Sequence, residues 1–200
     1  MFYDPSAEKE THSRNLPHWQ QVQRLYFVTF RLADSIPQER LEQIKAQRKE
    51  WNCRNSQPYS ESQLVEYYML FSKRVEDWLD DHYGKCVLGL PECRSIVADA
   101  MEYFNGKRYE LDHWVIMPNH VHVLVMPLAE HVLSDICHNW KSYTAHQINK
   151  CLGNVGQLWQ HESFDHIVRS EMQLEKFREY IGANASKCPQ RSLLSQARIK

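Results

Sequence analysis

The chain has 200 residues, which suits a single domain with additions, and its formal net charge is −1 at pH 7. Hydrophobic residues make up 42% of the sequence, enough for a substantial core. No apolar run approaches the roughly 20 residues that span a membrane, and no signal-peptide core is present, so we expect a cytoplasmic protein. Its six cysteines are scattered, which argues against a zinc ribbon or a disulfide framework and favours reduced thiols.

The first half of the chain predicts one strand followed by helices. Residues 1–20 are polar and predict an irregular N-terminal arm. Residues 25–32 are rich in aromatic and β-branched side chains and predict a strand. Hydrophobic spacing and capping residues then predict three helices, at residues 37–51, 60–84 and 91–104.

The second half predicts a pair of strands and two further helices. Strands are expected at residues 109–117 and 119–126, and helices at 133–151 and from 170 through 181. Pro118 and Asn119 interrupt the apolar run between the two strands, so we expect a bend or bulge there. Short extended pieces are expected at 158–160 and 164–168. This order favours an α+β sandwich in which an antiparallel sheet carries helices on one face.

Two histidines on the strand at 119–126 are the most informative residues. Strand side chains alternate between faces, so His120 and His122 point the same way and Val121 points the other way. Two imidazoles side by side on a rigid element suit a divalent metal ion, although two surface histidines on a half-buried strand are an equally simple interpretation. Mixed nitrogen and oxygen ligands would favour Mg²⁺ or Mn²⁺ over a closed structural zinc site.

The last helix offers a third ligand next to a nucleophile. Tyr180 and Asn184 are four residues apart, so they lie one turn apart on the same helix face. The phenol of Tyr180 would attack a phosphate, and the amide oxygen of Asn184 would complete the metal site. A packing tyrosine beside Phe177 and Ile181 is the simpler structural role.

Tyr143 and Gln147 form a rival pair with the same spacing on the helix at 133–151. Tyr143 lies three residues after Trp140, which predicts a place on the buried stripe and a packing role. Spacing alone does not separate Tyr143 from Tyr180 as the nucleophile.

Four segments together resemble a known family. They are MPNHVHVLV at 117–125, WKSYTAHQIN at 140–149, LWQHESFDHIVR at 158–169 and EYIGAN at 179–184. In this order they are similar to the single-tyrosine HUH transposases, and more narrowly to the REP-associated tyrosine transposases. The likeness extends over nearly the whole chain, with residues 37–106 resembling a helical insert found in some members.

The resemblance implies a ferredoxin-like fold and a set of roles. His120 and His122 would bind the divalent metal with Asn184, and Tyr180 rather than Tyr143 would be the nucleophile. The reaction would be cleavage and transfer of single-stranded DNA near a REP-like hairpin, through a 5′-phosphotyrosine intermediate. The family usually has proline after the asparagine, whereas Ala185 follows here, which leaves the local geometry open.

DNA contacts are expected from residue type alone. The C-terminal tail at 186–200 is basic, and it could lie along phosphates or be simply solvated. Candidate contacts to phosphates or unpaired bases are Lys141, Arg169, Lys187, Arg191, Trp159 and Phe164. A core position is the alternative for Trp159.

Other functions remain open from the sequence. The chain could be a domesticated hairpin-binding protein that no longer cleaves, or a metal-dependent nuclease that uses water instead of tyrosine. We expect a monomer or a homodimer, no membrane partner, and weak affinity for random duplex DNA because the net charge is near neutral.

Overall fold

The computed structural model describes residues 1–3, 10–13, 17–21, 23–56, 59–187 and 194–196. The chain divides into two compact units, one made of residues 1–33 and 87–200 and the other of residues 34–86. Residues 37–106, the expected insert, include parts of both units, because the segment after residue 86 belongs to the first unit.

The first unit is built on a five-stranded antiparallel sheet with the order β6-β3-β5-β4-β7. The strands are β3 (Tyr26–Arg31), β4 (Tyr109–Ile116), β5 (His120–Pro127), β6 (Phe164–Ile167) and β7 (Leu194–Gln196). The central strand β5 pairs with β3 on one side and with β4 on the other. The sequence interpretation of β3 to β6 as strands is therefore confirmed.

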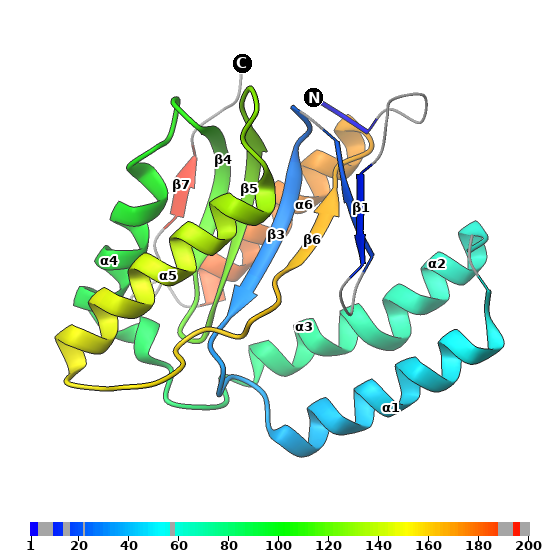
Figure 1. Ribbon diagram of the computed structural model, residues 1–200, viewed down its shortest axis with the longest axis horizontal. Coiled ribbons are helices and arrows are strands. Elements are labelled where there is room, and N and C mark those ends of the chain that lie inside the picture. Colours follow the sequence, from blue (N-terminus) through cyan, green and yellow to red (C-terminus); the bar gives the residue numbers. More distant parts are fainter. Residues whose placement is uncertain (4–9, 14–16, 22, 57–58, 188–193, 197–200) are drawn as a thin grey trace. The chain divides into compact units, whose positions relative to one another are not determined.

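Three helices complete this unit: α4 (Pro91–Glu102), α5 (Leu133–Leu152) and α6 (Glu171–Lys187). Taken as β3-α4-β4-β5-α5-β6, the core has the ferredoxin-like strand order, which confirms the predicted α+β class. Figure 1 shows α4 and α5 in front of the sheet and α6 behind it. The expectation of helices on one face thus describes α4 and α5, while α6 covers the opposite face.

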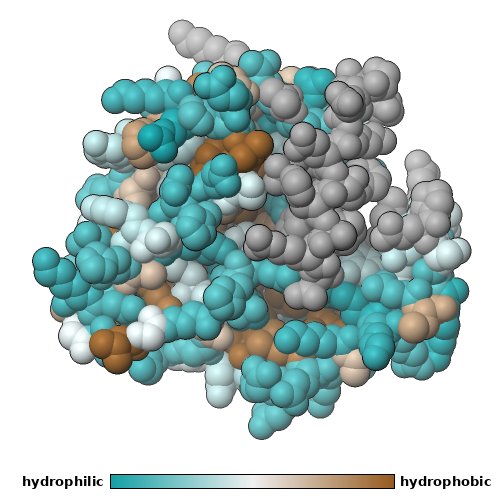
Figure 2. All heavy atoms as spheres, in the orientation of Figure 1, coloured by the Kyte–Doolittle hydropathy of each residue, from teal (hydrophilic) through white to brown (hydrophobic). Residues whose placement is uncertain are grey.

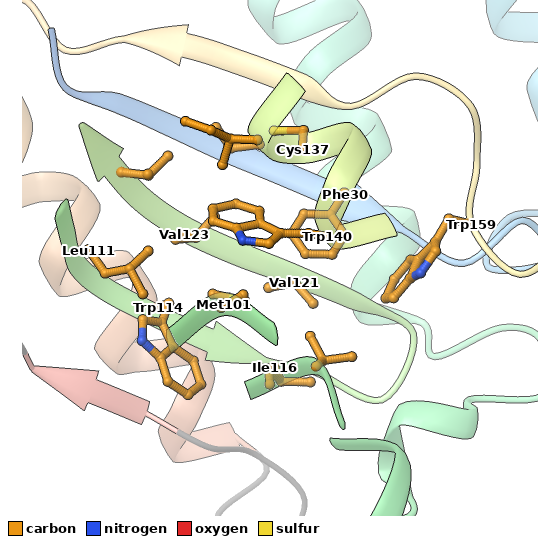
Figure 3. Packing of buried hydrophobic residues seen from close by; sticks show 14 of the residues in the cluster. Phe30, Met101, Leu111, Trp114, Ile116, Val121, Val123, Cys137, Trp140 and Trp159 are labelled. Atoms are coloured by element: carbon orange, nitrogen blue, oxygen red, sulfur yellow. The ribbon is translucent and has the colours of Figure 1, made fainter. Parts of the chain in front are cut away.

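The face under α4 and α5 holds the larger core. Helix α5 buries a stripe at helical spacing that includes Ile136, Trp140 and Ile148. Figure 3 shows Trp140 lying against Phe30 and Val121 of the sheet. This interlocking apolar packing stabilises the sandwich by removing a large apolar area from water.

The opposite face has a smaller core beneath α6. Phe27 of β3 and Leu124 of β5 pack there against Leu174 and Ile181 of α6. The stripe predicted for the last helix is therefore confirmed. This second face also carries the histidines.

The second unit is helical and has its own small core. It contains α1 (Gln38–Arg54), α2 (Glu61–Tyr67), a π-helical segment at Tyr68–Ser72 and α3 (Lys73–Asp80). The predicted capping box is confirmed, since Ser60 N–H donates to Gln63 Oε1 at 2.8 Å and Gln63 N–H to Ser60 Oγ at 3.3 Å. The single long helix predicted at 60–84 contains the π-helical segment in its middle.

The N-terminal region differs from the expected irregular arm. Its described parts include a hairpin of β1 (Glu10–Ser13) and β2 (Pro17–Gln20). Tyr3 N–H also donates to Val168 O at 2.9 Å, and Leu25 N–H to Met1 O at 2.9 Å. Backbone pairing, which composition does not reveal, therefore orders these segments.

Hydrophilic residues predominate on the face of the molecule in Figure 2, with smaller hydrophobic patches between them. Among the residues that the structure describes, no helix has both the length and the apolar character needed to cross a membrane.

Candidate active site

The histidines stand at the start of β5, next to a tight turn. Met117 N–H donates to His120 O at 2.8 Å, which closes the turn at Pro118 and Asn119. The expected bend is therefore present, while the irregularity in strand register lies elsewhere, between Leu111 and Trp114 of β4.

The two imidazoles converge on one point. His120 Nε2 and His122 Nε2 lie 3.0 Å apart, and both side chains are fully buried. Neighbouring ligands of an octahedral ion at about 2.1 Å lie about 3.0 Å from each other, so the two nitrogens fit one divalent ion. No cluster of three or more His, Cys, Asp or Glu side chains suited to a metal occurs within the described residues.

Each imidazole has a second polar partner on its other nitrogen. His120 Nδ1 lies 2.7 Å from Asn119 Oδ1, and His122 Nδ1 lies 2.7 Å from Thr29 Oγ1. Thr29 is the cross-strand partner of His122 in the pairing of β3 with β5. Sequence reasoning missed both partners. The signal available was a polar residue within the apolar run YFVTFR and an asparagine directly before the first histidine.

Helix α6 brings the predicted tyrosine to the histidines. Tyr180 Oη lies 3.5 Å from His122 Nε2, and its ring meets the imidazole edge-on at 5.1 Å between centroids. The ring is half-buried against the small core and meets Phe27 edge-on at 6.0 Å. The structure thus joins residues that are 58 positions apart in the sequence.

Asn184 follows one turn later and is fully buried. Its Nδ2 donates to Tyr180 O at 3.1 Å, and its Oδ1 accepts from Lys187 Nζ at 3.3 Å. Helix α6 continues to Lys187, because Ala185 supports a helix where a proline would disfavour it. Asn184 therefore lies inside the helix, on the side that is buried.

Electrostatics favours neutral imidazole at this site. Burial, with a smaller contribution from the charge of Lys187, lowers the pKa of His122 to about 3. Arg31 is the cross-strand partner of His120 and shares its face of the sheet. Burial lowers the pKa of Arg31 to about 10, which leaves it charged at neutral pH. Lys187 is thus the cation whose charge acts on His122, and Arg31 lies on the same face of the sheet as His120.

Tyr143 does not lie where the sequence predicted. It is 56% exposed, and its neighbour Thr144 takes the buried position on α5. Helix α5 packs on the face of the sheet opposite to α6. The prediction that Tyr143 lies on the buried stripe was wrong, and the structure does not bring this tyrosine to the histidines.

The candidate DNA contacts have different surroundings. Trp159 is 5% exposed and donates from Nε1 to Thr144 Oγ1 at 2.9 Å, so it is a core residue rather than a stacking platform. Lys141 Nζ donates to Gln160 O and His161 O, and these bonds hold the segment before β6 against α5.

Arg169 lies over the ring of Tyr3, 5.6 Å from its centroid. Phe164 is half-buried against the small core. Arg191 lies outside the described residues. Of the candidate phosphate contacts, Lys187 is the one that the structure brings next to His122.

The chain is an α+β protein with a ferredoxin-like sheet. The sheet carries two convergent histidines, which face a tyrosine on α6. Residues 91–184 match the family model described as IS200-like transposases. The matched segment runs from α4 through Asn184 of α6 and therefore includes both histidines and Tyr180. No curated protein matches the chain significantly.

Two solved structures are similar to the chain at low sequence identity. One, described as a REP-associated tyrosine transposase bound to a REP hairpin, is 16% identical, with a TM-score of 0.46 over 88% of this chain and 74% of that one. The other, described as a candidate transposase from Deinococcus radiodurans, is 13% identical, with a TM-score of 0.42 over 86% of this chain and 96% of that one.

Proposed function

We propose that this chain is a metal-dependent transposase that cleaves and joins single-stranded DNA beside REP-like hairpins, with Tyr180 as its nucleophile. The observation that carries the proposal is the distance of 3.5 Å between Tyr180 Oη and His122 Nε2. A phenol at that distance from a pair of neutral imidazoles lies where it can attack a phosphate that they help to position. The match of residues 91–184 to the family model of IS200-like transposases supports the same reaction class.

The residues present fit a divalent cation, either Mg²⁺ or Mn²⁺. His120 and His122 would hold it through Nε2, and Asn184 would add an amide oxygen by releasing Lys187. When bound, the cation supplies Lewis-acid polarisation of the scissile phosphate. Burial lowers the pKa of His122 to about 3, which keeps that imidazole neutral and available as a ligand.

Tyr180 performs the covalent step in this proposal. Its phenolic oxygen bonds to phosphorus as the proton leaves to water, and the bond from phosphorus to the 3′-oxygen breaks. That oxygen takes up a proton and becomes a free 3′-hydroxyl, while the 5′-phosphate remains on the tyrosine. Attack by a different 3′-hydroxyl reverses the step and gives strand transfer without ATP. Arg31 and Lys187 supply positive charge for the phosphate.

Covalent capture tests the proposal. The protein is incubated with Mg²⁺ or Mn²⁺ and labelled single-stranded DNA carrying the palindrome beside its own gene, and the products are separated under denaturing conditions. Wild type is expected to give a DNA-shifted protein band, and Tyr180→Phe none. Tyr143→Phe is the matched control, because it removes an equivalent hydroxyl on the opposite face and should retain the band.

The other outcomes identify the alternative functions. A band that survives Tyr180→Phe and disappears in Tyr143→Phe would move the nucleophile to α5. Hairpin binding with no covalent band in any variant would make the protein a non-cleaving hairpin binder. Cleavage that persists in Tyr180→Phe without covalent capture would indicate a nuclease that uses water.

A further inference from the structure

Four buried side chains form a continuous hydrogen-bonded row across β3, β5 and the turn before β5. The row runs from Thr29 Oγ1 to His122 Nδ1 (2.7 Å), from His122 Nε2 to His120 Nε2 (3.0 Å), and from His120 Nδ1 to Asn119 Oδ1 (2.7 Å). Thr29 is 7% exposed, and the other three side chains are 0% exposed. Buried polar atoms need partners, so the direction of each hydrogen bond is constrained by its neighbours.

The amide oxygen of Asn119 sets that direction. An amide oxygen only accepts, so His120 carries its proton on Nδ1 and has a lone pair on Nε2. His122 then donates from Nε2 to His120, which leaves a lone pair on His122 Nδ1. The hydroxyl of Thr29 must therefore donate to His122 Nδ1. In the metal-free protein the donors all point from Thr29 toward Asn119.

A cation that binds a lone pair on Nε2 of both histidines changes the hydrogen bonds of His122 and leaves the bond between His120 and Asn119 as it is. His120 already presents its lone pair, but His122 must lose its proton from Nε2 and gain one on Nδ1, so its ring keeps one proton and stays neutral. The new Nδ1–H needs an acceptor in a buried position. A hydroxyl can turn from donor to acceptor without moving its oxygen, whereas an amide oxygen cannot donate.

We propose that Asn119 and Thr29 are the positioning residues of the metal site. Asn119 holds His120 in the metal-ready tautomer, and Thr29 reverses its hydrogen bond so that His122 can adopt that tautomer when a cation binds. This inference rests on the proposed function, because it concerns the same site. Partners of this kind orient metal-binding imidazoles, and their removal typically costs 10- to 100-fold in metal affinity.

Thr29→Val tests the proposal, because valine keeps the shape of threonine and removes the hydroxyl. Mn²⁺ affinity, measured by calorimetry on the full chain, is expected to fall by about 10- to 100-fold. Thr29→Ser keeps the hydroxyl and should stay close to wild type. Thr144→Val is the matched control, since Thr144 is a buried threonine on the opposite face whose hydroxyl bonds Trp140 O. It should leave Mn²⁺ affinity unchanged.

Nitrogen-15 spectra of the histidine rings give a second measurement on the wild type. The ring proton of His122 is expected on Nε2 without metal and on Nδ1 with Mg²⁺, while that of His120 stays on Nδ1. An unchanged His122 tautomer, or wild-type Mn²⁺ affinity in a folded Thr29→Val variant, would overturn the inference. The metal-free spectrum tests the row even if Thr29→Val does not fold.

Failure of the proposed function has a different signature. In one outcome, wild type gives no covalent band while Thr29→Val still binds Mn²⁺ more weakly than Thr29→Ser. That pair of results would refute the transposase activity and leave the positioning roles intact. Covalent capture by the wild type, with equal Mn²⁺ affinity in both variants, would refute the positioning roles alone.

Discussion

Arg178 of α6 binds the carboxylate of Asp112 on β4 with two hydrogen bonds. Its Nε donates to Asp112 Oδ1 at 3.1 Å and its Nη2 donates to Oδ2. Asp112 is fully buried at the register irregularity of β4, where His113 is a further partner. Because Tyr180 follows Arg178 by two residues, this pair fixes the helix that carries Tyr180, the proposed nucleophile.

Replacement of Asp112 by Asn is expected to destabilise the protein by about 3–5 kcal/mol, because it leaves the Arg178 charge without its buried partner. Urea denaturation measures the change. The exposed pair between Arg40 and Asp81 provides the control, and Asp81→Asn should cost less than about 1 kcal/mol. Equal effects of the two substitutions would show that the buried pair does not hold α6.

Tyr180→Phe should separate activity from stability. The Tyr180 hydroxyl has a long contact of 3.5 Å with His122, while its ring packs against Phe27 and is kept by phenylalanine. The free energy of unfolding is therefore expected to change by about 1 kcal/mol, while covalent capture is lost entirely. Thermal unfolding and the capture assay together check both parts. A large loss of stability would identify Tyr180 as a structural residue.

Stability should depend on pH through two buried histidines. Burial, with Lys187, lowers the pKa of His122 to about 3, and burial, with Arg169, lowers that of His166 to about 4. Their ordinary value in the unfolded chain is 6.5, so the unfolded state binds more protons below that pH. Stability is therefore full above about pH 7 and decreases as the pH falls, by up to about 1.4 kcal/mol per pH unit for each histidine.

Urea denaturation in EDTA between pH 7.5 and 5.5 measures this dependence, in a window where ordinary carboxyl groups stay ionised. His122→Gln should reduce the pH dependence of the free energy of unfolding by the contribution of one histidine. His146→Gln changes an exposed residue of α5 and should leave the pH dependence of stability unaltered. A protein equally stable throughout this range would contradict the assignment of neutral, buried imidazoles.

Trp159→Phe should act on the fold and not on DNA. The indole is buried, meets Phe30 edge-on at 5.0 Å and donates to Thr144 Oγ1. Its replacement leaves a cavity and removes the hydrogen bond that Thr144 Oγ1 accepts, so we expect a loss of about 1–3 kcal/mol. Hairpin affinity, measured by fluorescence anisotropy on the folded variant, should match wild type. A selective loss of hairpin affinity with unchanged stability would return Trp159 to the DNA interface.

Period-two and helical patterns predicted the parts of the site that depend on local geometry. The alternation along β5 correctly predicted that Val121 points away from His120 and His122, and the structure places Val121 in the core under α4 and α5. The stripe of α6 was also predicted, since Leu174 and Ile181 are buried. Local periodicity is enough here because strand side chains alternate between the two faces of the sheet and a helix buries one stripe.

Long-range polar contacts were beyond the sequence. Arg178 and Asp112 are 66 residues apart, and the only local signal was an acidic residue within an apolar strand. Tyr143 was misplaced because a residue three positions from Trp140 can lie at either edge of the helix stripe, and Thr144 takes the buried place. The pairing of Thr29 with His122 depends on strand register, which no single strand encodes.

The division of the site between β5 and α6 has a consequence for its dynamics. His120 and His122 belong to a strand paired on both sides, so their backbone amides should exchange with solvent only when the whole sheet unfolds. Helix α6 is held by one small apolar cluster and the Arg178 pair, so it opens at a lower free energy. Tyr180, the proposed nucleophile, can therefore move away together with Asn184, while His120 and His122 stay in place on β5.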